Sequence, residues 1–357
     1  MKENTKISIN KKYYKSIDGL RVISCFAIII MHIRANTTYN ISGWIWDVLV
    51  PSWTWFVYLF IMISGFSMCT GYLKKFNNNS VNLELFYKKR YSRILPFFSF
   101  LVIIAMILEH NISAFYEGTI EITLLFGLLP NNHLDVLGVS WTLGVIFLFY
   151  LLFPFFTVLL KNKKRAWIGF IISLWINYVC SIYFFGSDFV TELFTPRHSF
   201  IYCIPLFIAG GIVYLYSNQI CEVSKKFRQG LFISCILGTI MWYITPETIA
   251  GIDILFIKTL IIFMLWLVYT VSVESKILSN KVMVYFSSIS MEMYLAHMVI
   301  FRLIEKLNLL YIFGDTNIGG YFSISFVFIL DIVGLIIFIK CYNVFIEIIK
   351  SIWKKFD

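Results

Sequence analysis

Charged residues are scarce in this sequence. Asp, Glu, Lys and Arg make up 14% of the 357 residues, whereas hydrophobic residues make up 59% and include 36 Phe. Soluble domains carry about a quarter charged residues and about half apolar ones. This scarcity argues against a water-soluble globular domain, because so many apolar side chains cannot all be buried in one aqueous core. The composition therefore predicts a protein that uses lipid as its solvent.

Closely spaced cysteine pairs are also missing. None of the seven cysteines has CxxC spacing, and most fall within apolar runs, where cysteine packs as a small hydrophobic residue. We predict neither a disulfide framework nor a metal site. The net charge of +10 comes from short basic clusters that lie between apolar runs. This pattern is typical of membrane proteins, and we expect no nucleic-acid partner.

A cleavage site is missing as well. The first apolar run, residues 22–31, has no small-residue cleavage signal, and Asp18, Arg21 and His32 flank it closely. We expect this run to be a retained first span and not a signal peptide.

Ten apolar runs are candidates for crossing a bilayer, which takes about 20 residues per helix. They cover residues 17–35, 49–71, 94–108, 141–160, 166–185, 200–217, 230–245, 253–273, 284–304 and 321–340. The shorter apolar segment 119–130 is expected to be interfacial or re-entrant. The predicted fold is an all-α polytopic bundle of about ten transmembrane helices. It forms one integral-membrane domain over residues 1–357, with a leader at 1–16, spans within 17–340 and a tail at 341–357.

The positive charges predict the orientation of the bundle. With the amino terminus inside, 24 of the 30 Lys and Arg residues fall in cytoplasmic segments, provided that 119–130 does not cross. Both termini are therefore predicted to be cytoplasmic.

Two ionisable residues mark the first span. Arg21 and His32 are eleven residues apart, so on a helix they share one face about 16 Å apart along the axis. Ionisable groups within a membrane usually face a polar cavity or a partner. We predict that Arg21 binds an anionic donor, held by Asp18, and that His32 is a catalytic base. The alternative, in which Arg21 snorkels to the headgroups and His32 is interfacial, stays open.

Two further motifs have ordinary explanations when each is taken alone. Ser64 and Gly65 near the end of the second span allow close helix packing. Arg90 and Arg93 are i, i+3 neighbours that can bind phosphate bidentately, although any cytoplasmic loop is basic.

Together these motifs resemble the acyltransferase-3 family of integral-membrane acyltransferases. The matching residues are Arg21 and His32, then Ser64-Gly65-Phe66, then Arg90, Arg93 and Pro96, then Trp141-Thr142-Leu143, and finally Ile289-Ser290 with Tyr294-Leu295 and His297. They follow the family's order and spacing from Asp18 to His297. Two positions depart from the family pattern: Ile146 stands where a Glu is common, and Met291 stands where an aromatic residue is usual.

The resemblance implies an O-acyltransferase that uses acyl-CoA, usually acetyl-CoA, as a donor substrate and has no permanently bound cofactor. Arg90 and Arg93 would clamp the phosphates of CoA, with Arg21 guiding the donor. His32 would deprotonate a glycan hydroxyl or accept the acyl group itself. The remaining matched positions would line the substrate site, namely Ser64, Trp141, Tyr294 and His297. The resemblance and the residue usage place the protein in a bacterial plasma membrane, with the bilayer, acyl-CoA and a glycan as its partners.

A catalytic imidazole needs an orienting acceptor, and Ile146 cannot provide one. Glu292, in the ninth span, is the carboxylate that we predict as the catalytic partner, with Asp331 as a second candidate. Most charged residues of the outer segments are expected to be solvated; they are Glu109, His110, Glu117, Glu121, His133, Asp135, Asp188, Glu192, Arg197 and His198. The tryptophans Trp44, Trp46, Trp53 and Trp55 are expected to form an interfacial belt rather than a sugar platform.

Two other classes of function remain as alternatives. A glycan or solute transporter would show inverted repeats with matched broken helices, and the sequence shows no such symmetry. A ligand-binding module without turnover is kept open by Ile146. Because the chain stops at Asp357, we expect no fused acceptor domain, so that the protein acylates its acceptor directly or passes the group to a separate protein.

Overall fold

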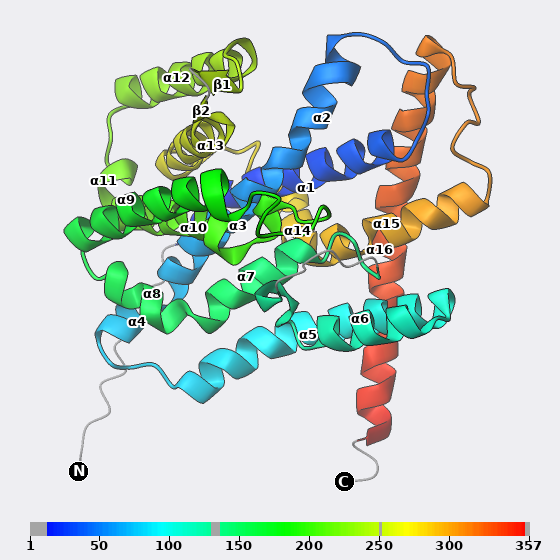
Figure 1. Ribbon diagram of the computed structural model, residues 1–357, viewed down its shortest axis with the longest axis horizontal. Helices are drawn as coiled ribbons and strands as arrows, with labels where there is room; N and C mark the ends of the chain where they lie inside the picture. The colour runs from blue at the N-terminus through cyan, green and yellow to red at the C-terminus, as the bar shows by residue number, and fades with distance from the viewer. Residues whose placement is uncertain (1–12, 130–135, 250–251, 354–357) are drawn as a thin grey trace.

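The computed structural model describes residues 13–129, 136–249 and 252–353, which form an almost entirely helical bundle (Figure 1). The first elements are α1 (Ser16–Ala35), η1 (Ile45–Leu49), α2 (Val50–Ser52), η2 (Trp53–Trp55), α3 (Phe56–Met68), η3 (Cys69–Leu73), α4 (Lys74–Asn77), α5 (Leu83–Glu109), α6 (Ile112–Ile122) and η4 (Phe126–Leu128). They are followed by α7 (Trp141–Leu151), α8 (Phe153–Leu159), α9 (Lys163–Val179), η5 (Cys180–Phe184), η6 (Pro196–His198), α10 (Phe200–Leu215), α11 (Ser217–Cys221) and α12 (Lys225–Ile244). The last are β1 (Thr248–Ile249), β2 (Ile252–Asp253), α13 (Leu255–Ser272), α14 (Lys281–Ser288), α15 (Ser290–Lys306) and α16 (Asn317–Trp353). The two short strands pair antiparallel.

Seven helical stretches of the described chain are long and apolar enough to cross a membrane. They are α1, the run Ile45–Asn77, α5, the run Lys163–Phe184, α12, α13 and α16. Two bent pairs, α7 with α8 and α14 with α15, pass the same test as broken spans. Helix α10 is apolar but shorter, and most of its residues are buried in the protein. The all-α polytopic fold is confirmed, and each of the ten predicted runs overlaps one of these elements.

Both bends leave a backbone carbonyl that a side chain satisfies. The axis turns by 64° between α7 and α8, where Pro154 lacks an N–H to continue the helix, and Tyr87 donates to the carbonyl of Leu151 over 2.8 Å. The axis turns by 71° between α14 and α15 without a proline, and Ser290 donates to the carbonyl of Ser287 over 2.9 Å. The second bend directs the start of α15 into the bundle.

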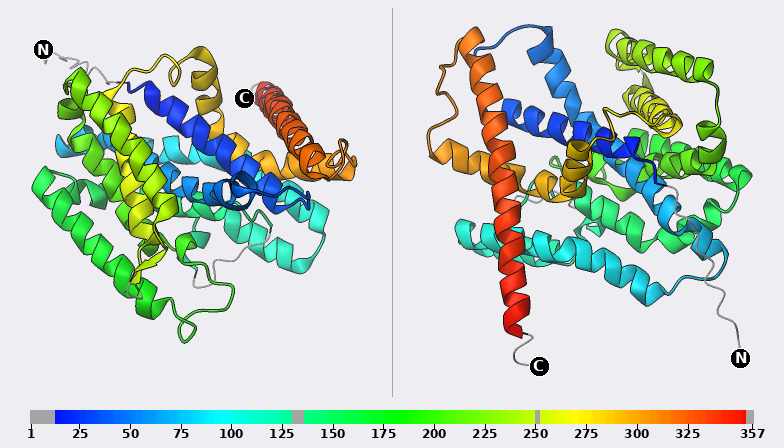
Figure 2. Two further views of the ribbon diagram at one scale, coloured as in Figure 1. Left: turned by 90° about the horizontal axis from the view of Figure 1, so that it is seen from above. Right: turned by 180° about the vertical axis from the view of Figure 1, so that it is seen from behind.

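Glycines allow the closest contact in the bundle, which joins α3 to α10. A Cβ on Gly65 would collide with the carbonyl oxygen of Phe207, and one on Gly210 would collide with that of Met62. The predicted role of Gly65 in helix packing is therefore confirmed. Figure 2 shows α1 and α3 at the centre of the bundle, with α12 and α13 on one side and α16 on another. Side chains that α1 directs inward therefore meet several helices.

Residues 119–130 do not form a span within their described part, 119–129. They comprise the end of α6, which packs along α5, and the single turn η4. A Cβ on Gly118 would collide with Met106, so the two helices lie in close contact. This arrangement agrees with the prediction that the segment is not transmembrane.

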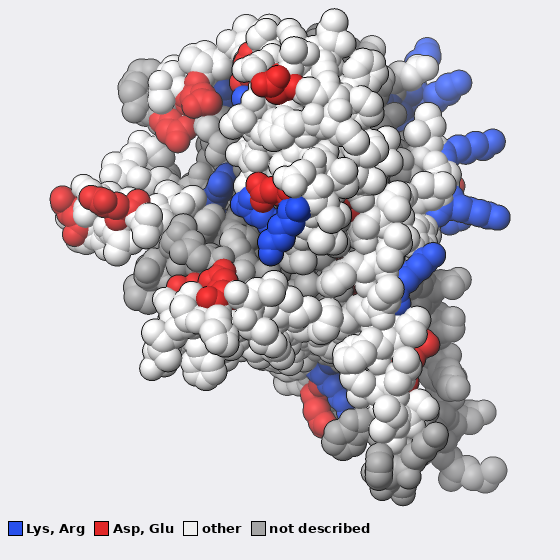
Figure 3. Space-filling model, turned by 90° about the vertical axis from the view of Figure 1, so that its right-hand side faces the viewer, with Lys and Arg blue, Asp and Glu red and all other residues white. Residues whose placement is uncertain are grey.

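Charge is separated on the face that Figure 3 shows. Lys and Arg side chains project mainly from one edge of this face, and Asp and Glu gather mainly toward the other edge and the centre. The separation agrees with the predicted charge asymmetry across a bilayer. Helix α16 continues to Trp353, well past the predicted span end at residue 340, because neither Gly nor Pro interrupts residues 335–353.

Candidate active site

A cavity of about 180 Å³ lies between α1, α3, α5, α7 and α15. Its lining residues are Arg21, Phe60, Ser64, Ser67, Arg90, Arg93, Ile94, Thr142, Leu143, Ile146, Tyr150, Ser290, Met291, Tyr294 and Leu295. Three arginines from two helices contribute to the lining, and we call their part of the cavity the arginine end. Arg21, Arg90, Arg93 and Ser64 are thereby brought together as the sequence predicts.

Arg21 is positioned by hydroxyl groups. Its guanidinium donates to Ser287 over 3.3 Å and to Ser67 over 3.4 Å. Ser287 in turn donates to the carboxylate of Asp18 over 2.7 Å. Asp18 therefore holds Arg21 through Ser287, a residue that arrives from α14 and that local sequence spacing could not reveal.

The pair Arg90 and Arg93 lies on α5, which begins at Leu83, so the predicted i, i+3 relationship is confirmed. Arg90 donates to the hydroxyl of Tyr72 over 2.9 Å and packs over the rings of Tyr72 and Tyr150 at 4.9 Å and 5.5 Å. Arg93 is more exposed, on the same cavity. Aromatic packing holds a guanidinium in place without neutralising its charge.

The arginine end has more positive than negative charge. Within the described ranges, no ion pair at salt-bridge distance joins Arg21, Arg90 or Arg93 to a carboxylate. The cavity lining itself contains no Asp or Glu. Buried or partly buried cations of this kind favour an anionic ligand, and phosphate suits the forked guanidinium geometry.

Two histidines meet at the other end of α1. The rings of His32 and His297 lie 5.0 Å apart between centroids, tilted by 49°. His297 is fully buried, and its Nδ1 lies 2.7 Å from the carbonyl oxygen of Tyr294. Because a carbonyl only accepts, Nδ1 carries the proton and Nε2 of the neutral ring is an acceptor. This Nε2 has no hydrogen-bond partner among the described residues. We call this pair the histidine end.

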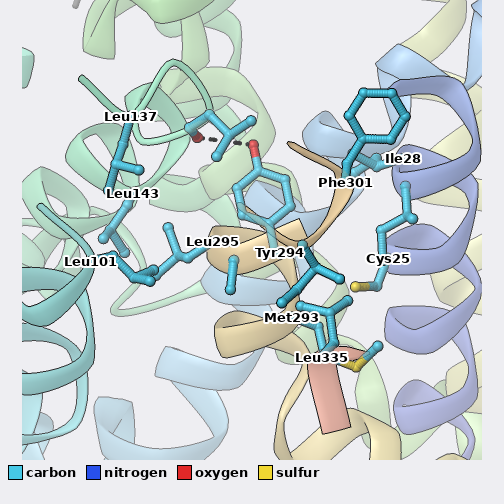
Figure 4. Packing of buried hydrophobic residues seen from close by; sticks show 14 of the residues in the cluster. Cys25, Ile28, Leu101, Leu137, Leu143, Met293, Tyr294, Leu295, Phe301 and Leu335 are labelled. Carbon is cyan, nitrogen blue, oxygen red and sulfur yellow. Dashed lines mark hydrogen bonds between the residues drawn. The ribbon is translucent and has the colours of Figure 1, made fainter. Parts of the chain in front are cut away.

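Tyr294 stands between the two ends. It lines the cavity, its ring centroid is 6.0 Å from that of His297, and its hydroxyl lies 2.9 Å from the hydroxyl of Thr142. The tyrosine hydroxyl also donates to the carbonyl of Val139 over 3.2 Å, the bond drawn in Figure 4. His32 is not among the cavity-lining residues. The cavity therefore ends at Tyr294 and Thr142, and the histidine pair lies beyond them.

Trp141 lies outside the cavity lining and packs on residues of the turn η6. Its ring stacks on His198 at 4.3 Å with an interplanar angle of 19°, and the guanidinium of Arg197 lies 5.8 Å from its centroid. Arg197 also donates to Thr54 over 2.9 Å and is close enough to His32 to interact with it electrostatically. Most charged side chains of the outer segments are expected to be solvated, but Arg197 and His198 are partly buried and pack against Trp141.

Comparison with known families decides the class of protein. The model of the acyltransferase-3 family, described as an acyltransferase domain, matches residues 14–339. The chain belongs to this family. The matched range contains the arginine end, Tyr294 and both histidines, so the predicted acyltransferase class is confirmed.

Curated relatives of this acyltransferase-3 chain are bacterial. A protein of Staphylococcus aureus (strain COL) named "Putative O-acetyltransferase" is 27% identical over 386 residues, covering 94% of this chain and 57% of the relative, and a counterpart from strain MRSA252 matches equally. An uncharacterized protein of Haemophilus influenzae is 27% identical over 207 residues, covering 52% of this chain and 84% of the relative. The chain spans a little over half the length of the Staphylococcus relatives. No solved structure matches.

The carboxylates proposed as partners of His32 lie elsewhere in this acyltransferase-3 structure. Ile146 lines the cavity where the family resemblance predicts Glu. Glu292 is partly buried, one of its oxygens has no hydrogen-bond partner in the described chain, and it interacts electrostatically with Arg93. Asp331 is fully buried in α16, interacts electrostatically with Cys25 and shows no hydrogen bond to a described residue. The ring next to His32 is His297, so the catalytic role of Glu292 stays a prediction.

One outer carboxylate is buried, contrary to the expectation of solvation. Glu121 is fully buried and accepts a hydrogen bond from Ser140 over 3.2 Å. Burial raises the pKa of Glu121 to about 8, because desolvation disfavours the ionised carboxylate. Ser140 directly precedes Trp141, so Glu121 supports the start of α7. His133 and Asp135, from the same group of outer residues, lie outside the described residues.

Proposed function

We propose that this protein is a membrane O-acyltransferase that moves an acyl group from cytoplasmic acyl-CoA to a hydroxyl of an extracytoplasmic or lipid-linked glycan. The name of its relatives favours acetyl as the group that is moved. The observation that carries the proposal is the arrangement along α1. Three arginines converge on one cavity that is also lined by Tyr294, and the histidine pair lies beyond this tyrosine.

The donor fits the arginine end. CoA is polyanionic, and Arg90 and Arg93 lie one helical turn apart on the same cavity, a spacing that allows both guanidinium groups to contact its phosphates. Arg21, held by Ser67 and Ser287, lies deeper along the path that the pantetheine arm would take. The thioester would then point toward Tyr294.

The chemistry suits the histidine end. His32 takes the proton from the acceptor hydroxyl as its oxygen attacks the thioester carbon, a C–O bond forms, the C–S bond breaks, and the CoA thiolate leaves and is protonated. In the other route a nitrogen of His32 attacks the thioester carbon and the C–S bond breaks to release the CoA thiolate. The acceptor hydroxyl then attacks the acyl-imidazole, the N–acyl bond breaks, and the freed imidazole takes up the hydroxyl proton. Both routes need a fixed imidazole orientation, and the packing against His297 supplies one.

The acceptor would approach from the side of Trp141. Arg197 and His198 pack on this ring, and Arg197 also contacts Thr54. A cation and an aromatic face next to the base suit the binding of a sugar that carries negative charge and the stabilisation of the oxyanion that forms during attack. The bacterial relatives support a plasma-membrane location in a bacterium.

Labelled acetyl-CoA incubated with membranes that contain the full chain tests the proposal. Label should enter the glycan fraction with wild type and not with His32→Ala. His110→Asn is a matched control, because His110 is an exposed histidine with a left-handed backbone that Asn tolerates. Equal transfer by wild type and His32→Ala, or none by wild type with any glycan fraction of its host, would contradict the proposal.

A further inference from the structure

A second cavity, of about 310 Å³, lies between α1, η2 and α3 on one side and the pair α12 and α13 on the other. We call it the lateral slot. Its lining residues are Leu20, Ile23, Leu49, Ser52, Trp53, Trp55, Phe56, Leu59, Thr239, Trp242, Tyr243, Thr259, Ile262, Phe263, Trp266, Thr270 and Leu278. Helix α1 contributes to both linings, since Leu20 lines the slot and Arg21 lines the first cavity.

Most polar side chains of the lateral slot bond to one another or to the backbone. The indole of Trp242 donates to Thr259 over 2.9 Å, and the indole of Trp266 donates to Thr239 over 3.1 Å. Ser52 lies 2.7 Å from the hydroxyl of Tyr243, and Thr270 donates to a backbone carbonyl. The slot therefore offers an aromatic and aliphatic surface on which most polar groups are already paired, which suits a hydrocarbon ligand.

The lateral slot lies where bilayer lipid has access. Cys235 is the one buried residue of α12, a helix that packs mainly on α13 at the edge of the bundle (Figure 1). Ile23 is 42% exposed although most residues of α1 are buried. An exposed isoleucine within a membrane span contacts lipid chains.

The turn η2 connects the lateral slot to the reaction site. Trp53 and Trp55 line the slot, whereas Thr54 between them accepts a hydrogen bond from Arg197, which packs against Trp141. Successive residues of a 3₁₀ turn point about 120° apart, so this one turn faces both sites. A molecule with its tail in the slot would have its head group next to Arg197.

We propose that the lateral slot binds the hydrocarbon tail of a lipid-linked glycan acceptor and presents the glycan over η2 to the histidine end. This inference rests on the proposed function for the identity of the head group. The competing outcome is that a bulk membrane phospholipid occupies the slot. Such a lipid would have no role in presenting a glycan to the histidine end.

Photolabelling tests the binding without requiring turnover. The full chain in phosphatidylglycerol nanodiscs receives a trace of polyprenyl phosphate that bears a diazirine in its tail, and crosslinked peptides are identified by mass spectrometry. Crosslinks should concentrate on α1, η2, α12 and α13, and excess unlabelled polyprenyl phosphate should remove them. Crosslinks spread evenly over all lipid-facing helices, or crosslinks that resist this competition, would overturn the proposal.

A substitution that fills the lateral slot sharpens the test. Ile23→Trp should lower slot crosslinking about tenfold. Ile171→Trp is the matched control, because Ile171 is 62% exposed on α9, away from the slot, and crosslinking should stay unchanged. The wild-type crosslink map keeps the proposal testable should Ile23→Trp fail to fold.

Transfer assays separate this proposal from the proposed function. With labelled acetyl-CoA, Ile23→Trp should transfer about tenfold less to a lipid-linked glycan but equally to the same glycan without its lipid. Slot crosslinking without any transfer by wild type would contradict the proposed function and leave the slot proposal standing. If wild type transferred acetyl equally to the glycan with and without its lipid, the slot proposal would be contradicted and the proposed function would stand.

Discussion

The two ends of helix α1 solve different problems with different side chains. At the arginine end, hydroxyl groups and aromatic rings hold three permanently charged guanidinium groups on one cavity. At the histidine end, a backbone carbonyl holds a fully buried imidazole against His32. Fixed charge suits the binding of an anion, whereas a neutral imidazole suits the acceptance of a proton. The comparison shows that fixed positive charge and neutral imidazoles lie at different ends of one helix, with Tyr294 between them. Under the proposed function this arrangement separates donor binding from chemistry.

The largest effect is expected from removing the chemistry and keeping the binding. His32→Ala should lower the rate of acyl transfer about 10²- to 10⁴-fold. It should leave the affinity for CoA unchanged, because His32 does not line the cavity that contains the arginine end. Transfer assays and equilibrium binding of labelled CoA measure the two quantities separately. A large loss of CoA affinity in His32→Ala would contradict the assignment of donor binding to the arginine end alone, since both ends would then bind the donor.

The converse change should weaken binding and spare the chemistry. Arg90→Gln combined with Arg93→Gln should raise the Kd for CoA about 10- to 100-fold, because each charge-assisted hydrogen bond contributes about 1.5–3 kcal/mol. The transfer rate at saturating donor should change little. Arg165→Gln, at an exposed arginine of α9, should alter neither quantity. Unchanged CoA affinity in the double variant would show that the arginine end is not the binding site of the donor.

A smaller effect should follow from disturbing the orientation of His32. His297→Leu should lower the transfer rate about tenfold at unchanged donor KM and shift the pH–rate profile, because the ring that packs against His32 is lost together with its free acceptor Nε2. His297→Gln keeps an acceptor oxygen and should recover part of the rate. If the two variants lost the same activity with the wild-type pH profile, His297 would have a packing role only.

The smallest effect concerns stability at the start of α7. The pKa of buried Glu121 is raised to about 8, above its unfolded value near 4.5, so the folded state keeps a proton that the unfolded state releases. Stability is therefore full below pH 4.5 and falls as the pH rises toward 8. We expect the melting temperature to drop by roughly 5 °C between pH 5 and pH 8.5. In Glu121→Gln this dependence should be flatter, and an equally steep curve would assign it to other groups.

Much of the fold could be predicted because hydropathy is a local signal. Each predicted apolar run overlaps a helix, and the eleven-residue spacing of Arg21 and His32 correctly placed them along one helix. The bend at Ile289 was not predictable, because no proline or glycine marks it. Its physical cause is tertiary, since the bend allows Ser287 to reach Asp18.

The sequence predicts which residues belong to the site better than it predicts which of them contact one another. Motifs in the sequence point to the arginines and to His297. The sequence predicts a carboxylate as the orienting partner of His32, whereas the ring beside it in the structure is His297. Arg197 was assigned to solvent because loop charge is ordinarily solvated. Its packing on Trp141 joins segments more than fifty residues apart, and such contacts leave no periodic signal in one sequence.

The sidedness of donor use tests the central claim most directly. Membrane vesicles of both orientations, containing the full chain, would be supplied with membrane-impermeant labelled acetyl-CoA from outside. The account predicts transfer to glycan in inside-out vesicles, where the arginine end faces the added donor, and none in intact right-side-out vesicles. Transfer in right-side-out vesicles alone would contradict a donor site at the cytoplasmic end of α1.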